Sequence, residues 1–247
     1  MTRRRRRKPL ARGNLPPHLA INVQTTKDRE LKVISWNLLR LDQGGAHVKD
    51  IAALIEEQTP DLVLLQEAFP DVERLPDMIG GTLFHEPMPS RLYGLAAWSP
   101  HQIAAREAMT LPVSRMPGRL PPRVAQLLHV GEITFANVHL SHGQWLNRWQ
   151  LMRLGAALHG PAAVIGDFNA VGPTVLPGFR DIGPRGRTHM CGTMIPLRLD
   201  RCLARGVRCV SGTILDRGAS DHHPIVLKLQ AEHQAISIET VPVEAAE

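Results

Sequence analysis

Aromatic side chains and long apolar runs are scarce in this sequence. Aromatic residues account for 4% of the 247 residues, and Tyr93 is the only tyrosine. A surface that holds nucleic-acid strands mainly by stacking bases on aromatic rings is therefore not expected. No apolar run approaches the roughly 18 residues that a membrane-spanning helix needs, so we expect no such helix.

Cysteine is also rare, and its three occurrences are Cys191, Cys202 and Cys209. The number is odd and the spacing is not that of a zinc cluster, so we interpret all three as reduced thiols without a disulfide framework. The basic N-terminus is not followed by the apolar segment of a secretory signal. These features predict a cytoplasmic protein, and we expect it to be a monomer.

Lysine is scarce too, so the basic charge is mostly arginine, and it is unevenly distributed. Residues 1–12 contain seven basic and no acidic residues, whereas residues 231–247 contain four acidic residues and no Lys or Arg. Like-charge blocks of this kind are typical of disordered segments. We predict a disordered arm and lead-in over residues 1–30, a single domain over residues 31–230 and a disordered acidic tail over residues 231–247.

The arginine-rich arm has three interpretations that the sequence leaves open. Residues 3–12 could hold nucleic-acid phosphates through counterion release. They could equally contact an anionic membrane surface. The third interpretation is a solubilising tail without a specific partner.

The rest of the chain alternates β-branched apolar runs with two helical stretches. Residues 48–58 have apolar positions at helical spacing and stop before Pro60. They lie between two strand-like runs at residues 31–36 and 61–66. Because strands outnumber helices, we predict an α+β domain of packed layers. Further strands are predicted at residues 93–98, 124–130, 133–138, 162–165, 197–203, 207–215 and 224–229, and a second helix at residues 144–158.

The second predicted helix carries Trp145 and Trp149 one turn apart. Met152, Leu154 and Leu158 continue a rough apolar stripe. Such a stripe usually packs on the core, and we expect the two tryptophans to be buried there. The alternative is that they form a platform on which bases stack.

Six polar clusters accompany the predicted strands, five of them at strand ends. A polar residue after a strand usually caps its own turn, so no single cluster identifies an active site. The clusters are Trp36-Asn37, Gln66-Glu67, Asn137-Val138-His139, Gly166-Asp167-Phe168-Asn169, Arg198-Leu199-Asp200-Arg201 and Ser220-Asp221-His222-His223-Pro224.

Together, and in this order, the clusters resemble the endonuclease/exonuclease/phosphatase superfamily. The most specific segments are LQE ending at Glu67, GDFN ending at Asn169 and SDHHP beginning at Ser220, and the likeness spans residues 31–229. The resemblance implies a four-layer α/β/β/α sandwich, in which two mainly antiparallel sheets pack face to face with helices outside. It also implies a metal-dependent phosphoesterase whose active site lies at one edge of that sandwich.

The resemblance assigns Glu67, Asn37 and Asp221 as metal ligands. All three offer oxygen, without Cys or paired His, which favours Mg²⁺ or Mn²⁺ over Zn²⁺. Leu39 departs from the family pattern, because several nucleases of the superfamily have a second acid at this position. We therefore expect weaker metal binding or a greater reliance on Asp221.

Five further residues are assigned to the reaction itself. Asp167 would orient and deprotonate the attacking water, and Asn169 would donate to the phosphate or to that water. His222 would contact the phosphate as an imidazolium held by Asp200, because an adjacent carboxylate raises the pKa of a histidine. His139 would donate to a nonbridging oxygen or support the leaving group.

The sequence thus predicts hydrolysis of phosphodiester, or alternatively phosphomonoester, bonds, with a nuclease or small phosphodiesterase preferred. One alternative is a phospholipid or inositol-phosphate hydrolase that the arginine arm recruits to anionic membranes. Another is a catalytically inactive binding module on the same fold. Arginines that could line a phosphate-binding cleft, or simply be solvated, crowd the region around Asp200: Arg180, Arg185, Arg187, Arg198, Arg201, Arg205 and Arg208.

Overall fold

The computed structural model describes residues 29–114, 122–191 and 195–232. Residues 1–28 and 233–247 lie outside the described residues, so the disorder of the basic arm and of the acidic tail stays a prediction. Among the described residues, no helix is long and apolar enough to cross a membrane.

The first sheet is built around the parallel pair of β1 and β2. β1 (Leu31–Asn37) lies between β2 (Leu62–Ala68) and the antiparallel β14 (Ile225–Ala231). All of β1 except Lys32 is buried, as expected for a strand covered on both faces. The strand order is β13-β14-β1-β2-β4-β3, in which β3, β4 and β13 are Thr82–Pro87, Gly94–Ser99 and Val207–Ile214.

The second sheet repeats this plan around the parallel pair of β7 and β8. β7 (Ile133–His139) pairs with β6 (Val124–Val130) on one side and with β8 (Ala162–Asp167) on the other. The other strand pairs of both sheets are antiparallel, which confirms the predicted arrangement. The strand order is β5-β6-β7-β8-β12-β9. The strands not yet given are β5 (Ala105–Thr110), β9 (Arg180–Asp181) and β12 (Asp200–Arg205). A separate two-stranded sheet is formed by β10 (His189–Cys191) and β11 (Ile195–Leu197).

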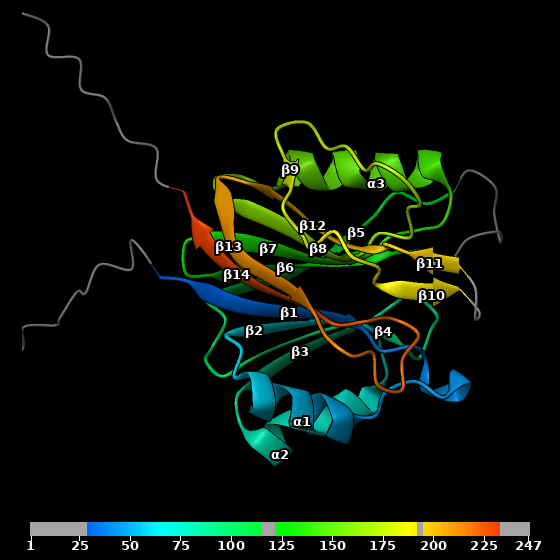
Figure 1. Cartoon of the computed structure of the whole chain (residues 1–247), viewed down its shortest axis with the longest axis vertical. Helices are drawn as coiled ribbons and strands as arrows, with labels where there is room; N and C mark the ends of the chain where they lie inside the picture. The colour runs from blue at the N-terminus through cyan, green and yellow to red at the C-terminus, as the bar shows by residue number, and fades with distance from the viewer. Residues whose placement is uncertain (1–28, 115–121, 192–194, 233–247) are drawn as a thin grey trace, which may run out of the picture.

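The two sheets pack face to face and helices cover their outer faces, giving four layers (Figure 1). α1 (Val48–Gln58) and α2 (Leu75–Ile79) lie outside the first sheet, and α3 (Gln144–Ala157) lies outside the second. Leu64 and Phe135 belong to the apolar core between the sheets. The predicted α/β/β/α sandwich is confirmed. Two short 3-10 helices, η2 (Leu41–Gln43) and η3 (Pro70–Arg74), complete the fold.

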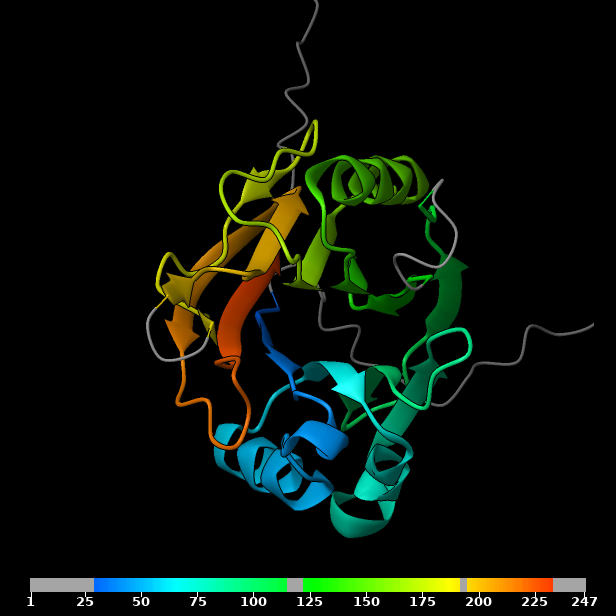
Figure 2. The same ribbon diagram turned by 90° about the vertical axis from the view of Figure 1, so that its right-hand side faces the viewer.

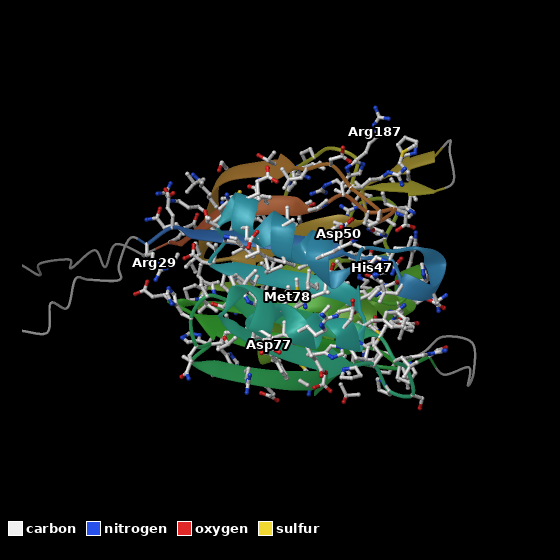
Figure 3. The ribbon with its side chains drawn as sticks, turned by 90° about the horizontal axis from the view of Figure 1, so that it is seen from below. Arg29, His47, Asp50, Asp77, Met78 and Arg187 are labelled. Atoms are coloured by element: carbon white, nitrogen blue, oxygen red, sulfur yellow. The ribbon has the colours of Figure 1, made fainter. Side chains whose placement is uncertain are left out.

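α1 begins and ends at the predicted residues. At its N-terminus the Asp50 carboxylate accepts the N–H of His47 at 2.8 Å, which satisfies a donor that the helix leaves free (Figure 3). Ile51 and Ile55 are buried against the outer face of the first sheet. Pro60 prevents the helix from continuing.

The expectation that the tryptophans of α3 pack in the core is wrong. Trp145 is 88% exposed and Trp149 is 50% exposed. The buried face instead contains polar side chains that have buried partners. Gln150 accepts the N–H of Ser141 at 2.9 Å, and Asn147 donates to the backbone carbonyl of Phe168. The apolar stripe was misleading because these hydrogen bonds let an amide pack where an apolar residue was expected.

The single strand predicted at residues 197–203 is also wrong. β11 ends at Leu197 and β12 begins at Asp200. Between them, the Arg198 guanidinium turns to the Asp181 carboxylate, with N–O distances of 2.6 and 2.7 Å. β5 was not predicted, because it lies at a sheet edge and only Met109 of its six residues is buried.

Candidate active site

The strand ends that carry the polar clusters meet at one edge of the sandwich, which faces the viewer in Figure 2. In the second sheet, His139 lies opposite Asp167 across β7 and β8, and Asp167 lies opposite Asp200 across β8 and β12. Directly opposed residues on neighbouring strands share a face of the sheet. The three side chains therefore form a row, and each residue is at most 3% exposed.

Asn37 and Glu67 reach the same edge from the first sheet. Glu67 lies in a β-bulge, where the pairing of β2 with β4 shifts after Gln66, and its φ is +56°. A bulge re-aims a side chain, so Glu67 faces the edge while Gln66 donates to Asn137 at 2.7 Å inside the core. The Asn37 amide donates to Asp167 Oδ2 at 3.0 Å and thereby connects the two sheets.

The segment from Ser220 to Pro224 is tied to the end of β1. Ser220 Oγ donates to the Asn37 carbonyl at 2.7 Å and accepts the N–H of His222 at 3.0 Å. Trp36 Nε1 donates to the His222 carbonyl at 3.0 Å. Trp36 and Ser220 therefore act as positioning residues for His222.

His222 is held between two carboxylates. Its Nδ1 lies 2.8 Å from Asp200 Oδ2, and its Nε2 lies 3.8 Å from Asp167 Oδ2. Burial alone would lower the pKa of His222, but the Asp200 and Asp167 charges raise it to about 10. The side chain is therefore an imidazolium at neutral pH, with Nε2 directed toward Asp167.

His139 has the opposite electrostatic character. Burial, with the Arg123 cation nearby, lowers the pKa of His139 to about 3, so its imidazole is neutral. Its Nε2 lies 3.4 Å from Asp167 Oδ2 and 3.9 Å from Glu67 Oε1. Burial would raise the pKa of Asp167, but the His222 cation and hydrogen bonds from Asn169 and Asn37 outweigh it and lower that pKa. Asp167 is thus a buried carboxylate that stays ionised.

The backbone conformation of the GDFN segment explains why it contains glycine at its first position and asparagine at its last. Gly166 has φ +144°, and a Cβ there would lie 2.0 Å from the Val138 carbonyl oxygen. Only glycine allows β7 and β8 to approach so closely. Asn169 has φ +47°, and its N–H donates to Asp167 Oδ1 at 2.8 Å. The turn therefore fixes the orientation of the Asp167 carboxylate.

A cavity of about 390 Å³ opens between these side chains. Asp200 does not line it and instead lies behind His222. The remaining sequence-predicted site residues all line it: Asn37, Glu67, His139, Asp167, Asn169, Asp221 and His222.

Three basic residues that line the cavity were not predicted: Arg123, His142 and His189. Arg123 is 5% exposed and immediately precedes β6. Because β6 runs antiparallel to β7, its beginning reaches the same edge as the end of β7, and this topology could have identified Arg123. His189 lies beside His222, with ring centroids 4.3 Å apart. No strand was predicted at His189 or immediately before it, so its pairing with His222 was not expected.

The arginines around Asp200 mostly have structural partners rather than lining the cavity. Arg198 and Arg201 both contact the Asp181 carboxylate, at 2.6 and 3.4 Å. Arg187 is exposed and points away from the ribbon (Figure 3). The other four bind carboxylates, a side-chain amide or backbone carbonyls: Arg180 with Glu232, Arg185 with Asp181, Arg205 with Leu158 and Gly160, and Arg208 with Gln230.

The oxygen atoms around the cavity suit a divalent cation. Burial, together with the Asp167 charge, raises the pKa of Glu67, as expected for a carboxylate that lacks sufficient positive charge nearby. Asp221 Oδ1 is buried and has no hydrogen-bond partner among the described residues. Asn37 Oδ1 accepts the Leu39 N–H at 3.1 Å and keeps a second lone pair. Such oxygen donors favour Mg²⁺ or Mn²⁺.

A four-layer sandwich with buried carboxylates and histidines at one edge is the architecture of metal-dependent phosphoesterases. The model of the Endonuclease/Exonuclease/phosphatase family matches residues 34–222, and the chain belongs to this family. A comparison with curated proteins found no match.

Solved structures share the fold at low sequence identity. A functionally unknown conserved protein from Enterococcus faecalis V583 is 21% identical, with a TM-score of 0.69 over 82% of this chain and 100% of that chain. An endonuclease/exonuclease/phosphatase from Bacteroides vulgatus is 15% identical, with a TM-score of 0.68 over 83% and 100%. D. rerio TDP2, in complex with a single-strand DNA product, is 16% identical, with a TM-score of 0.64 over 83% and 100%.

Proposed function

We propose that the protein is a divalent-metal-dependent phosphodiesterase, with a nuclease or small phosphodiesterase activity. The arrangement of Asp167 and His222 carries this proposal. An ionised carboxylate lies 3.8 Å from an imidazolium on the wall of one cavity. The carboxylate can orient a water molecule, while the imidazolium can neutralise a phosphate oxygen.

Glu67, Asn37 and Asp221 are proposed to hold Mg²⁺ or, alternatively, Mn²⁺. When bound, the ion would neutralise phosphate charge. Glu67 and Asn37 come from adjacent strands of the first sheet, and Asp221 comes from the segment that the Ser220 hydroxyl ties to Asn37. The three ligands would therefore be held by one connected part of the fold.

The chain's own residues can supply the base and the hydrogen-bond donors of hydrolysis. Asp167 would take a proton from the water whose oxygen attacks phosphorus, as the bond from phosphorus to the leaving oxygen breaks and the leaving oxygen takes a proton from solvent. His222 would contact a nonbridging oxygen, and Asn169 would donate to the phosphate or to the water. Neutral His139 would donate to another nonbridging oxygen or to the leaving oxygen. The buried Arg123 adds a fixed positive charge to the same wall.

Nucleic acid or a nucleotide is the proposed substrate class. The D. rerio TDP2 structure that shares this fold contains a single-strand DNA product, which supports the proposal. A lipid substrate would depend on residues 3–12, which lie outside the described residues. The free thiols of Cys202 and Cys209 support the proposal that the enzyme works in a reducing compartment such as the cytoplasm.

A substrate panel with and without Mg²⁺ or Mn²⁺ tests the proposed function. It should contain bis-p-nitrophenyl phosphate, plasmid DNA, RNA, inositol phosphates and sphingomyelin, with Glu67→Ala as the blank. We expect metal-dependent turnover of bis-p-nitrophenyl phosphate and of a nucleic acid, absent from Glu67→Ala. Equal rates with and without metal across the panel would favour an inactive binding module. Turnover of sphingomyelin or inositol phosphates alone would favour the lipid-directed alternative.

A further inference from the structure

His189 and His222 are held side by side by the main chain. The two residues form an isolated antiparallel bridge, flanked by a bond from Met190 N to Asp221 O at 3.3 Å and one from His223 N to Thr188 O at 2.7 Å. Opposed residues of an antiparallel bridge share a face. Accordingly, the two imidazole rings lie 4.3 Å apart and tilt by 41°.

The Asp221 carboxylate completes a group of three possible metal ligands. His189 Nδ1 lies 3.8 Å from Asp221 Oδ2, and one ligand atom from each of His189, Asp221 and His222 lies within 4.8 Å of the others. His189 Nδ1 and Asp221 Oδ1 are both buried without a hydrogen-bond partner in the described structure. Unpaired buried polar atoms are unfavourable, and a shared cation would satisfy both.

We propose that His189, Asp221 and His222 form a second metal site, specific for a late first-row divalent ion such as Zn²⁺. Two imidazoles and one carboxylate form a ligand set typical of zinc, whereas Mg²⁺ selects oxygen. Around a tetrahedral Zn²⁺ with bonds of about 2.1 Å, ligand atoms lie about 3.4 Å apart. The His189 Nδ1–Asp221 Oδ2 distance of 3.8 Å is close to that spacing, and the other separations in the group are at most 4.8 Å.

Asp200 supports this site as a second-sphere partner. It binds Nδ1 of His222 at 2.8 Å, so Nε2 is the ring nitrogen that a metal would bind, and the ion would displace the proton that Nε2 carries in the imidazolium. A carboxylate on the far nitrogen orients a histidine ligand and strengthens its binding to the metal.

A metal ion at this site inhibits catalysis, a consequence that rests on the proposed function. The Nε2 atom of His222 cannot bind Zn²⁺ and donate to a phosphate at the same time. Asp221 would likewise be withdrawn from the Mg²⁺ site. The protein is therefore activated by Mg²⁺ and inhibited by Zn²⁺, and His189 is the residue that determines the inhibition.

Metal binding by the full-length, metal-free protein tests the site without reference to activity. Titration with Co²⁺, followed by the visible absorption of tetrahedral Co²⁺, should show one equivalent bound by the wild type. His189→Ala and His189→Asn should each bind at least tenfold more weakly. His101→Ala, which removes an exposed histidine beyond the far end of β4, should bind like the wild type. Equal affinity of the folded His189 variants and the wild type would overturn the site.

X-ray absorption of the Zn²⁺-loaded wild type provides a readout that needs no variant. We expect two imidazole ligands in the first coordination sphere, and a sphere of oxygen ligands alone would overturn the proposal.

The inhibition is measured separately with Mg²⁺ and bis-p-nitrophenyl phosphate, where His189→Ala should raise the inhibition constant of Zn²⁺ at least tenfold. An unchanged constant would overturn the inhibitory role. If no substrate is turned over at all, the proposed function fails, while metal binding still decides the site.

Discussion

His222 and Asp200 form an ion pair inside the sandwich, with Nδ1 and Oδ2 2.8 Å apart and both residues at most 5% exposed. The bond fixes the ring orientation and leaves Nε2 facing the cavity. It also keeps the ring charged, because burial would otherwise favour the neutral form. One carboxylate thus controls both the geometry and the charge of the proposed phosphate contact.

Asp200→Asn should move the alkaline limit of activity to lower pH. In the wild type, the pKa of His222 is raised to about 10, so its imidazolium is lost only as the pH rises through that value. Without the Asp200 charge, the pKa falls and the imidazolium is lost at a lower pH. We expect a loss of about 10²–10³ in kcat/KM at neutral pH, as is usual when one preorganised donor to the reacting group is lost. The measurement is kcat/KM as a function of pH.

The same substitution should affect stability in a defined direction. A histidine whose pKa is raised by folding contributes its full stabilisation below pH 6.5, and loses it as the pH rises through about 10. Asp200→Asn should therefore lower the free energy of unfolding most strongly just below pH 6.5, and the difference should fade at more acid pH, because burial raises the pKa of Asp200 and the ion pair is lost when that carboxylate is protonated. Denaturant unfolding at several pH values measures this, and a pH-independent difference would contradict the assigned ion pair.

Asp167→Asn should retain less than a tenth of wild-type turnover. The variant preserves the shape of the side chain but removes the charge that would accept a proton from water. Asp216→Asn is a matched control, because Asp216 is an exposed acid outside the cavity. Turnover should be measured at saturating metal, so that a change in metal affinity is not mistaken for a change in the chemical step. Retention of more than a tenth would remove Asp167 from the role of base.

The layers and the strand-end residues could be predicted because each depends on a local signal. Apolar runs identified the strands that are buried on both faces, such as β1 and β8, and the family motifs identified the polar residues that follow them. Edge strands such as β5 lack that signal, because most of their residues are exposed. Arg123 and His189 were not identified because they reach the cavity through strand pairing, which one linear motif does not encode.

Two variants of α3 test whether burial, rather than apolar character, determines how much a side chain contributes to the free energy of unfolding. Leu154→Ala should lower the free energy of unfolding by about 2–5 kcal/mol, because Leu154 is fully buried. Trp145→Ala should change it by no more than about 0.5 kcal/mol, because Trp145 is 88% exposed. Urea unfolding of both variants measures the difference. Similar losses in the two variants would show that Trp145 is covered in solution.

Leu39→Asp should strengthen the binding of Mg²⁺. Leu39 lines the cavity, and its N–H donates to Asn37 Oδ1, beside the proposed ligand atoms. A carboxylate there would add a second acid on the Glu67 side of the site. We expect the dissociation constant of Mg²⁺ to fall by about tenfold, since affinity rises with the number of charged ligands. Isothermal titration with the metal-free protein measures this change directly.

Leu39→Asn is the matched control for this gain. Leu39 has φ +54°, a left-handed conformation that Asn and Asp adopt more readily than Leu. Both variants should therefore relieve the same backbone strain, but only Leu39→Asp adds charge. A gain in Mg²⁺ affinity confined to Leu39→Asp would assign it to the new ligand. An equal gain in both variants would assign it to the backbone, and the missing acid at position 39 would then not limit the Mg²⁺ affinity.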